Sequence, residues 1–263
     1  MIEDATVTIL GSCSGTEPMP GRHHTSFTIE YRGKLYWFDA GECCSYTAYL
    51  NGIDLPATEA IFISHTHMDH IGGLPNLLWT LSKLSKVSQD SLRRLEDRNI
   101  QVFIPDLEVW DGIVKLLAGT EGGFRNPFKL HAKCYGDGVI YNESGISVFA
   151  LHNKHLGDAK PYKSFSFRVE IGTKSLVYSG DVRNIEDCEP LLDDCDILLM
   201  ETGHHKVEDV CDWLMKSGKR IDRLIFVHHG RAILDDPDRE LRKAKKIIGE
   251  KVAIADDGMV INL

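Results

Sequence analysis

The sequence is organised around the stretch Ser64-His65-Thr66-His67-Met68-Asp69-His70-Ile71-Gly72-Gly73. It follows the apolar, β-type run Ala60-Ile61-Phe62-Ile63, and it places three imidazoles and one carboxylate within six consecutive residues. Buried without partners, such polar groups would each cost about 2–7 kcal/mol. Imidazole nitrogen and carboxylate oxygen are the ligands that zinc and related divalent metals prefer. The stretch therefore predicts a metal site at the end of a strand.

The overall composition is that of a globular protein. The chain has 263 residues, a formal net charge of −9 and 43% hydrophobic residues. This size allows a substantial core, and we expect a single domain over residues 1–263, although two small domains would also fit. The aliphatic content excludes a disordered chain. The acidic balance argues against a broad nucleic-acid surface, because phosphate binding relies on clustered Lys and Arg.

Three features of the sequence bear on the cellular location. No apolar run approaches the roughly 20 residues that span a bilayer, so no membrane attachment is expected. The start, Met1-Ile2-Glu3-Asp4, is acidic and continues into a strand-like segment, which is unlike a signal peptide. The seven cysteines include the adjacent pair Cys43-Cys44 but no CxxC pair. Free thiols in a reducing cytoplasm fit this pattern better than a disulfide framework does.

Strand and helix patterns alternate along the chain, with hairpins mixed in, which predicts an α/β protein with mixed sheets. Helical spacing is found at residues 44–51, 74–85, 106–118, 207–216 and 238–248. β-type runs are found at residues 6–10, 25–30, 34–38, 60–63, 100–104, 128–134, 146–151, 165–171, 175–178, 195–200, 224–227, 252–255 and 259–261. The basic residues between positions 83 and 98 alternate with acidic ones, which favours a solvated helical face over an RNA-binding patch.

Histidine or aspartate recurs where the predicted strands end. Because strand ends in one layer converge, we expect these residues to share one site. Asp39 is either a turn residue or a carboxylate that orients a ligating histidine. Either His152 or His155 can supply a ligand from the same region. The strand-end positions are Asp39, His65, His155, Asp181, His205 and His228.

These motifs resemble the metallo-β-lactamase fold superfamily. Its signature, HxHxDH, stands here as His65-Thr66-His67-Met68-Asp69-His70. Asp39-Ala40-Gly41-Glu42 resembles its first motif, Ser179-Gly180-Asp181 its bridging-aspartate motif, and Val227-His228-His229 its final histidine motif. The resemblance extends along most of the chain. It implies a four-layer αββα sandwich of two mixed β-sheets flanked by helices.

Within the superfamily, the sequence is most similar to ribonuclease Z and its relatives. Leu10-Gly11-Ser12-Cys13-Ser14-Gly15-Thr16 resembles the opening of that branch, and Glu201 followed by His205 resembles its additional histidine motif. The chain has no Gly- and Pro-rich arm of the kind that this branch uses to grip transfer RNA. The resemblance therefore implies a hydrolase acting on phosphodiesters, such as a small nucleotide-derived ester or RNA.

The resemblance also implies a dinuclear metal centre. One metal would take His65, His67 and His155, the second would take Asp69, His70 and His228, and Asp181 would bridge them. His152 and His229 are the alternatives to His155 and His228. Such metals lower the pKa of a bound water toward about 7, which Asp69 would orient for attack. His205 is the candidate proton donor to the leaving group, with His204 and His229 as weaker alternatives.

The ligand types favour zinc, with manganese as an alternative. A di-iron redox branch of this fold carries Glu where His67 stands, so the sequence favours hydrolysis over a metal-binding or redox protein. A carboxylic ester, lactone or thioester is the second class of substrate that the same metals would serve. Relatives in this branch are often dimers, so a homodimer is a further expectation. Loops at residues 13–24 and 119–126 are expected to set specificity.

Overall fold

The computed structural model describes residues 5–120 and 123–263. The acidic start, residues 1–4, and residues 121–122 of the predicted loop 119–126 lie outside the described residues. The chain divides into two compact units. Unit 1 comprises Met1–Gly11, Pro18–Tyr135 and Asp257–Leu263, and unit 2 comprises Ser12–Glu17 and Gly136–Asp256. The expected single domain over residues 1–263 stays a prediction.

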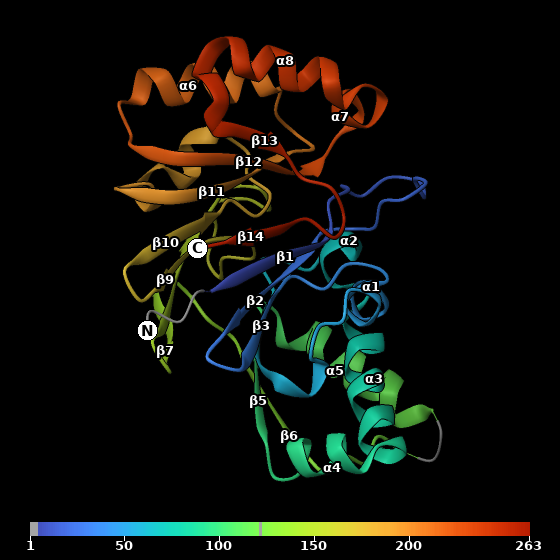
Figure 1. The fold of residues 1–263 in the computed structure, drawn as a ribbon. Helices are drawn as coiled ribbons and strands as arrows, with labels where there is room; N and C mark the ends of the chain where they lie inside the picture. Colours follow the sequence, from blue (N-terminus) through green and yellow to red (C-terminus); the bar gives the residue numbers. More distant parts are fainter. Residues whose placement is uncertain (1–4, 121–122) are drawn as a thin grey trace. The chain divides into compact units, whose positions relative to one another are not determined.

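Unit 1 is built on a mixed sheet of seven strands. The strand order is β14-β1-β2-β3-β4-β5-β6, and Figure 1 shows β14 beside β1. Neighbouring strands are antiparallel from β14 to β3 and parallel from β3 to β6. The strands are β1 (Thr6–Gly11), β2 (Ser26–Tyr31), β3 (Lys34–Phe38), β4 (Thr58–Phe62), β5 (Asn99–Phe103), β6 (Lys129–Lys133) and β14 (Val260–Asn262).

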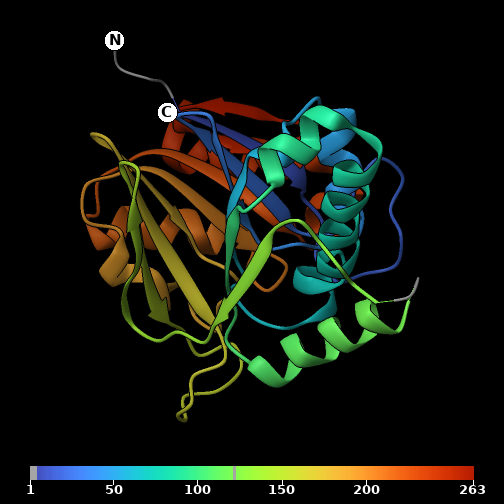
Figure 2. The same ribbon diagram turned by 90° about the horizontal axis from the view of Figure 1, so that it is seen from below.

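Helices pack against the unit 1 sheet. Helix α3 places Leu77 and Leu81 in one buried cluster with Trp37 and Ile61 of the sheet. Burying each such side chain contributes about 1.5–3 kcal/mol, so the apolar spacing that predicts this helix also anchors it. Figure 2 shows the cyan and green helices of this unit grouped together. The helices are α1 (Cys44–Leu50), η1 (Leu55–Ala57), α2 (Met68–Ile71), α3 (Leu74–Val87), α4 (Gln89–Leu95) and α5 (Leu107–Gly119).

Unit 2 is built on a second mixed sheet of seven strands. The strand order is β13-β12-β11-β10-β9-β8-β7. Neighbours are parallel from β13 to β10 and antiparallel from β10 to β7. The strands are β7 (Gly138–Glu143), β8 (Ile146–His152), β9 (Phe165–Ile171), β10 (Lys174–Tyr178), β11 (Cys195–Thr202), β12 (Ile221–His229) and β13 (Val252–Ile254).

Helices cover the parallel half of the unit 2 sheet, and Figure 1 shows α6 and α8 lying over β12 and β13. Val210 and Leu214 of α6 share a buried cluster with Leu198 and Phe226 of the sheet. Helix α8 adds Ala244 to the same cluster. The helices are η2 (Ile185–Leu191), α6 (Val207–Ser217), α7 (Arg231–Asp235), α8 (Pro237–Ile248) and η3 (Gly249–Lys251).

Strand β7 is missing from the expectations based on sequence. It pairs with β8 at the edge of the sheet, and Tyr141 is its one buried residue. Edge strands have a single neighbour, so their side chains are selected for packing less strongly than those of central strands. Val139 is accordingly 61% exposed, and the strand carries no clear apolar alternation.

The predicted architecture is otherwise confirmed: two mixed β-sheets are flanked by helices. Among the described residues, none of the helices combines the length and the apolar character that a bilayer span requires.

Candidate metal centre

In unit 1, the neighbouring parallel strands β3 and β4 end at the same edge of the sheet. Asp39 follows β3 directly, and its N–H donates to the carbonyl oxygen of Phe62, the last residue of β4, across 2.8 Å. His65 follows three residues later, and helix α2 begins at Met68. The histidine motif therefore lies between the end of a strand, as the sequence predicts, and the start of a helix.

The carboxylate of Asp39 connects the residues of this junction through hydrogen bonds. Its Oδ1 accepts from the Ser64 N–H across 2.7 Å, and its Oδ2 accepts from the Ser64 hydroxyl across 2.8 Å and from His70 Nδ1 across 2.7 Å. Asp39 has a φ of 55°, a conformation that Asp and His adopt more readily than most residues. Of the two roles that the sequence leaves open, the structure shows the carboxylate that orients a histidine.

Ser64 is a member of this network that is not among the predicted site residues. Its hydroxyl lies 3.1 Å from Nδ1 of His65 while it donates to Asp39. Ser64 therefore links His65 to the same carboxylate that holds His70. A serine at the end of a strand carries no specific signal, because serine is common wherever a turn begins.

The four candidate ligands of the motif form two pairs. His65 Nε2 lies 3.2 Å from His67 Nδ1, and His70 Nε2 lies 3.5 Å from Oδ2 of Asp69. Two ligand atoms that are each about 2.0–2.1 Å from a tetrahedral metal are about 3.3–3.4 Å apart. Both pairs therefore have the spacing and the donor chemistry that suit a divalent ion.

Gly41 allows the Asp39 loop to lie against the motif. Its N–H donates to the carbonyl oxygen of Thr25 across 3.1 Å. A Cβ at position 41 would stand 2.5 Å from the carbonyl oxygen of Asp69 and 2.6 Å from the carbonyl carbon of His24. Only glycine permits so close an approach of three backbone segments. The segment before β2 is therefore part of the surroundings of Asp69.

In unit 2, the parallel strands β10, β11 and β12 end at a second group of polar side chains. Asp181 follows β10, Glu201 lies near the end of β11, and His228 lies near the end of β12. All three side chains are buried. His228 has a φ of 49°, so this half, like Asp39 in unit 1, holds a left-handed residue at a strand end.

Asp181 faces two different histidines of unit 2. Its Oδ1 lies 3.2 Å from His228 Nε2, and its Oδ2 lies 3.7 Å from His155 Nε2. Each carboxylate oxygen therefore has its own imidazole neighbour. Asp181 could therefore offer one oxygen toward the side of His155 and the other toward the side of His228.

Glu201 lies behind His228, on the side away from Asp181. Its Oε2 lies 3.7 Å from His228 Nδ1, and its Oε1 accepts from His204 Nδ1 across 2.9 Å. Burial by itself would raise the pKa of Glu201, but the contacts with His204 and His228 hold that pKa below its usual range. The hydrogen bond with Glu201 in turn raises the pKa of His204.

The two neighbouring histidines considered as proton donors differ in placement. His205 Nε2 donates to the carbonyl oxygen of Val182 across 3.0 Å, and its side chain is 13% exposed. His204 is 44% exposed, and its ring centroid lies 5.0 Å from that of His155 and 5.8 Å from that of His228. The structure therefore places the ring of His204 against two candidate ligands. His204, Glu201 and His228 also bring ligand atoms within 4.8 Å of one another, which is close enough to hold a metal.

The two alternative ligands are engaged elsewhere in unit 2. His152 stacks on Tyr162 at 3.7 Å between ring centroids, and its Nδ1 donates to Asp137 Oδ2 across 2.8 Å. His229 is fully buried, and its Nε2 donates to the carbonyl oxygen of Ala255 across 2.7 Å. Because His155 and His228 face Asp181 instead, the geometry of unit 2 favours them over His152 and His229.

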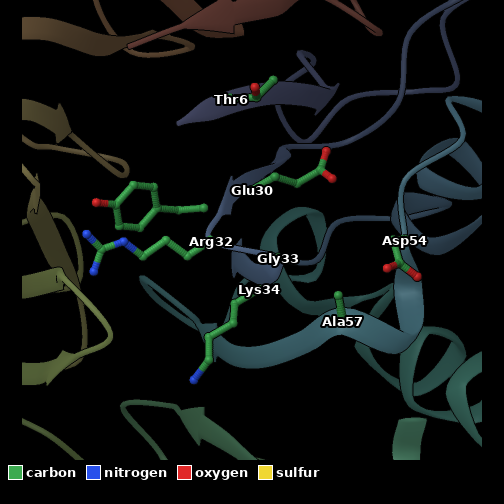
Figure 3. A pocket seen from close by; sticks show the side chains of 8 residues that line it. Thr6, Glu30, Arg32, Gly33, Lys34, Asp54 and Ala57 are labelled. Carbon is green, nitrogen blue, oxygen red and sulfur yellow. The ribbon is translucent and has the colours of Figure 1, made fainter. Parts of the chain in front are cut away.

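Unit 1 also carries a polar pocket of about 230 Å³ at the opposite end of β3 from Asp39 (Figure 3). Lys34 on its rim pairs with Glu59 across 2.7 Å, and Asp54 pairs with Arg94. The residues that line it include no histidine, so its chemistry differs from that of the candidate metal centre. They are Thr6, Glu30, Tyr31, Arg32, Gly33, Lys34, Asp54 and Ala57.

Comparison with known proteins places most of the chain in one family. Residues 47–229 match the family model described as the beta-lactamase superfamily domain. A ribonuclease Z of Treponema pallidum is 45% identical over 78 residues, which are 30% of this chain and 25% of that protein. The match thus spans a quarter of the length of that relative. A ribonuclease Z of Picrophilus torridus is 25% identical over 299 aligned residues, which cover 93% of this chain and 91% of that protein.

Two solved structures are similar over nearly the whole chain. The metallo-beta-lactamase fold protein YhfI from Bacillus subtilis has a TM-score of 0.79 at 16% identity, and the match covers 99% of this chain and 100% of YhfI. The short form of human tRNase Z has a TM-score of 0.69 at 20% identity, with 97% of this chain and 98% of that chain covered. At these identities the likeness shows the fold, and it confirms the metallo-β-lactamase fold that the motifs predict.

Proposed function

We propose that this chain, which belongs to the beta-lactamase superfamily, is a hydrolase that uses two divalent metal ions to cleave phosphodiesters. The observation that carries the proposal is the placement of Asp181, whose two oxygens lie 3.2 Å from His228 Nε2 and 3.7 Å from His155 Nε2. The paired ligand atoms of the unit 1 motif support the same reading. The ribonuclease Z relatives supply the substrate class.

The proposed ligand set follows the family motifs. His65, His67 and His155 would hold one ion, Asp69, His70 and His228 would hold the other, and Asp181 would serve both. Most of these donors are imidazoles and a minority are carboxylates. This set of donors suits zinc and can also bind manganese. Bound there, two divalent ions would activate a water at neutral pH and stabilise charge on the reacting phosphoryl oxygens.

The protein groups then have separate tasks. Asp69 orients the attacking water, because its carboxylate stands next to the ligand nitrogen of His70. Asp39 and Glu201 orient His70 and His228 from behind. The leaving alkoxide needs a proton, and an imidazole titrates in the useful range. His205 is the proposed donor, and His204 competes for this role because its ring stands beside His155 and His228.

We propose a small phosphodiester as the substrate ahead of a large RNA. The arginines between residues 83 and 98 are engaged within unit 1: Arg94 pairs with Asp54, Arg93 with Asp90, and Arg98 donates to the carbonyl oxygen of Ala57. Such engaged side chains offer little to a phosphate backbone, which draws affinity from clustered Lys and Arg. This supports the interpretation of the segment as a solvated helical face.

The direct test is turnover of bis(p-nitrophenyl) phosphate by protein loaded with zinc or manganese, with metal content measured on the same sample. We expect hydrolysis with at least one metal. An inactive protein that holds its metals would refute phosphodiesterase activity. A parallel panel of lactones and thioesters tests the second substrate class, and an electronic spectrum of the purified protein tests a redox centre.

We propose that residues 1–263 act as one domain, that the protein works in the cytoplasm, and that it forms a homodimer. The exposed apolar side chains Tyr46, Tyr49 and Trp79 on α1 and α3 suit a contact between subunits. Light scattering during size-exclusion chromatography measures the mass, and a Tyr46→Glu variant would become monomeric if this surface is the contact.

A further inference from the structure

His23 is held in one orientation by a carboxylate from a distant part of the sequence. Asp257 Oδ2 accepts from the His23 backbone N–H across 2.6 Å and lies 2.8 Å from His23 Nδ1. The Asp257 side chain is 9% exposed, and the His23 side chain is 36% exposed. Thr47 Oγ1 lies 3.5 Å from the same ring nitrogen. A mostly buried carboxylate thus fixes a partly exposed imidazole.

The contacts with Asp257 and Thr47 both involve Nδ1, so Nε2 lies on the opposite edge of the ring. A carboxylate that accepts Nδ1–H fixes the orientation of the ring. When Nε2 also carries a proton, it can donate to an anionic oxygen of a ligand, and such charge-assisted hydrogen bonds are strong.

The carbonyl group of His24, which follows His23 directly, lies close to the backbone of the candidate ligand Asp69. A Cβ on Gly11 would stand 1.7 Å from the carbonyl oxygen of His24 and 2.9 Å from that of His23. A Cβ on Gly41 would meet His24 and the Asp69 carbonyl oxygen at similar distances. Gly41 therefore brings the carbonyl group of His24, the residue after His23, next to the backbone of Asp69.

We propose that His23 is a substrate-binding residue: its Nε2–H donates to a non-bridging oxygen of the phosphodiester, while Asp257 is the positioning residue that holds the ring. This inference rests on the proposed function and names a specificity group for an anionic substrate. The competing explanation is that His23 and Asp257 only tie residues 21–25 to the segment before β14. The two explanations differ in whether Nε2 is needed.

Two substitutions separate the ring nitrogens. In His23→Asn the amide nitrogen takes the place of Nδ1, so the contact with Asp257 is kept and the group at Nε2 is lost. In His23→Gln the amide nitrogen takes the place of Nε2, so a donor toward substrate is kept and the contact with Asp257 is lost. His131→Asn is the matched control, because His131 is an exposed histidine of β6 whose Nε2 contacts Asn99.

The variants are compared, in the metal-loaded full chain, by kcat and KM on bis(p-nitrophenyl) phosphate, by calorimetric binding of inorganic phosphate and by thermal melting. We expect His23→Asn to keep its melting temperature and to lose about 10- to 100-fold in kcat/KM and in phosphate affinity. His23→Gln should melt earlier but retain more activity and phosphate binding than His23→Asn. Asp257→Asn should lower phosphate affinity to a smaller extent.

Wild-type kcat/KM and phosphate binding in His23→Asn would overturn the inference and leave the proposed function intact. If the wild-type protein cleaves no phosphodiester, the proposed function fails, and the phosphate titration still decides the role of His23. A wild-type protein that neither cleaves the ester nor binds phosphate overturns both.

Discussion

His70 donates from Nδ1 to the Oδ2 of Asp39 across 2.7 Å, and both side chains are fully buried. This contact decides which nitrogen of His70 carries its proton, and it leaves Nε2 as the nitrogen with a lone pair. Nε2 is also the atom that stands beside Asp69. Asp39 therefore selects the candidate ligand nitrogen of a residue that stands thirty-one positions later in the sequence.

Asp39→Asn tests this selection. The amide keeps the shape of the side chain but removes the charge that holds Nδ1–H and the Ser64 donors. We expect zinc affinity and activity to fall about 10- to 100-fold, as is usual when the partner of a ligating histidine is changed. Competition with a chromogenic chelator measures the affinity. Asp90→Asn, at an exposed carboxylate that pairs with Arg93, is the control. Unchanged affinity in Asp39→Asn would contradict the role given to this contact.

His67→Ala should remove metal and activity together. His67 is exposed and offers Nδ1 to the pair with His65, so its loss should change the free energy of unfolding by less than about 0.5 kcal/mol. We expect activity to fall about 100-fold or more, since losing a ligand costs at least as much as losing its orienting partner. Elemental analysis reports the metal content. A variant that retains both metals would show that His67 is not a ligand.

His205→Ala and His204→Ala identify the proton donor. His205→Ala should keep its metal content and lose about 10²- to 10⁴-fold in kcat, the range for losing a general acid. A fully active His205→Ala variant would refute this assignment. If His204→Ala loses activity with its metals intact, the role belongs to His204. If it also loses metal, the group formed by Glu201, His204 and His228 is a binding site.

Gly41→Ala should destabilise unit 1. The added methyl would stand 2.5 Å from the Asp69 carbonyl oxygen and 2.6 Å from the His24 carbonyl carbon, and both are backbone atoms that move only with their loops. We expect a loss of about 1–3 kcal/mol in the free energy of unfolding, measured by urea titration. Gly112→Ala in α5 is the matched control, because its methyl would meet no neighbour within 4 Å. Equal stability of the two variants would contradict the close approach at Gly41.

The cysteines should differ sharply in reactivity. Burial raises the pKa of Cys44, Cys188 and Cys195 to about 12, whereas Cys134 is exposed. Because the thiolate is the nucleophile, iodoacetamide at pH 8 should label Cys134 in the native protein and reach the three buried thiols after unfolding. Peptide mass spectrometry locates the label. Rapid labelling of Cys44 in the native protein would show that the core beneath α1 opens.

Sequence patterns were sufficient for features that depend on local chemistry. The apolar spacing of Leu77, Leu78 and Leu81 predicts α3, and the HxHxDH motif predicts the junction before it, because both signals lie within a few neighbouring residues. The family resemblance then predicts the fold, which the comparisons confirm. Strand β7 was missed because an edge strand exposes most of its side chains.

The contacts between distant residues could not be predicted from the sequence. From the sequence, Asp39 could equally be a turn residue, and only the structure shows that its carboxylate accepts a hydrogen bond from His70. His204 and His205 are indistinguishable as sequence neighbours, but the turn after β11 directs one ring toward His155 and the other toward the Val182 carbonyl. His23 and Asp257 are 234 positions apart, and only the folded unit 1 brings them together.

The last residues of unit 1 are translated after unit 2, so unit 1 can be completed only after unit 2 has been synthesised. Strand β14 pairs with β1, and Asp257 holds His23, yet residues 257–263 are translated after all of unit 2. Domains tend to fold as they emerge from the ribosome, in the order of synthesis. Unit 1 cannot follow that order, because its edge strand β14 and the partner of His23 are synthesised after unit 2. On the proposed role of His23, a nascent chain would therefore lack a completed binding group until after unit 2 has been made.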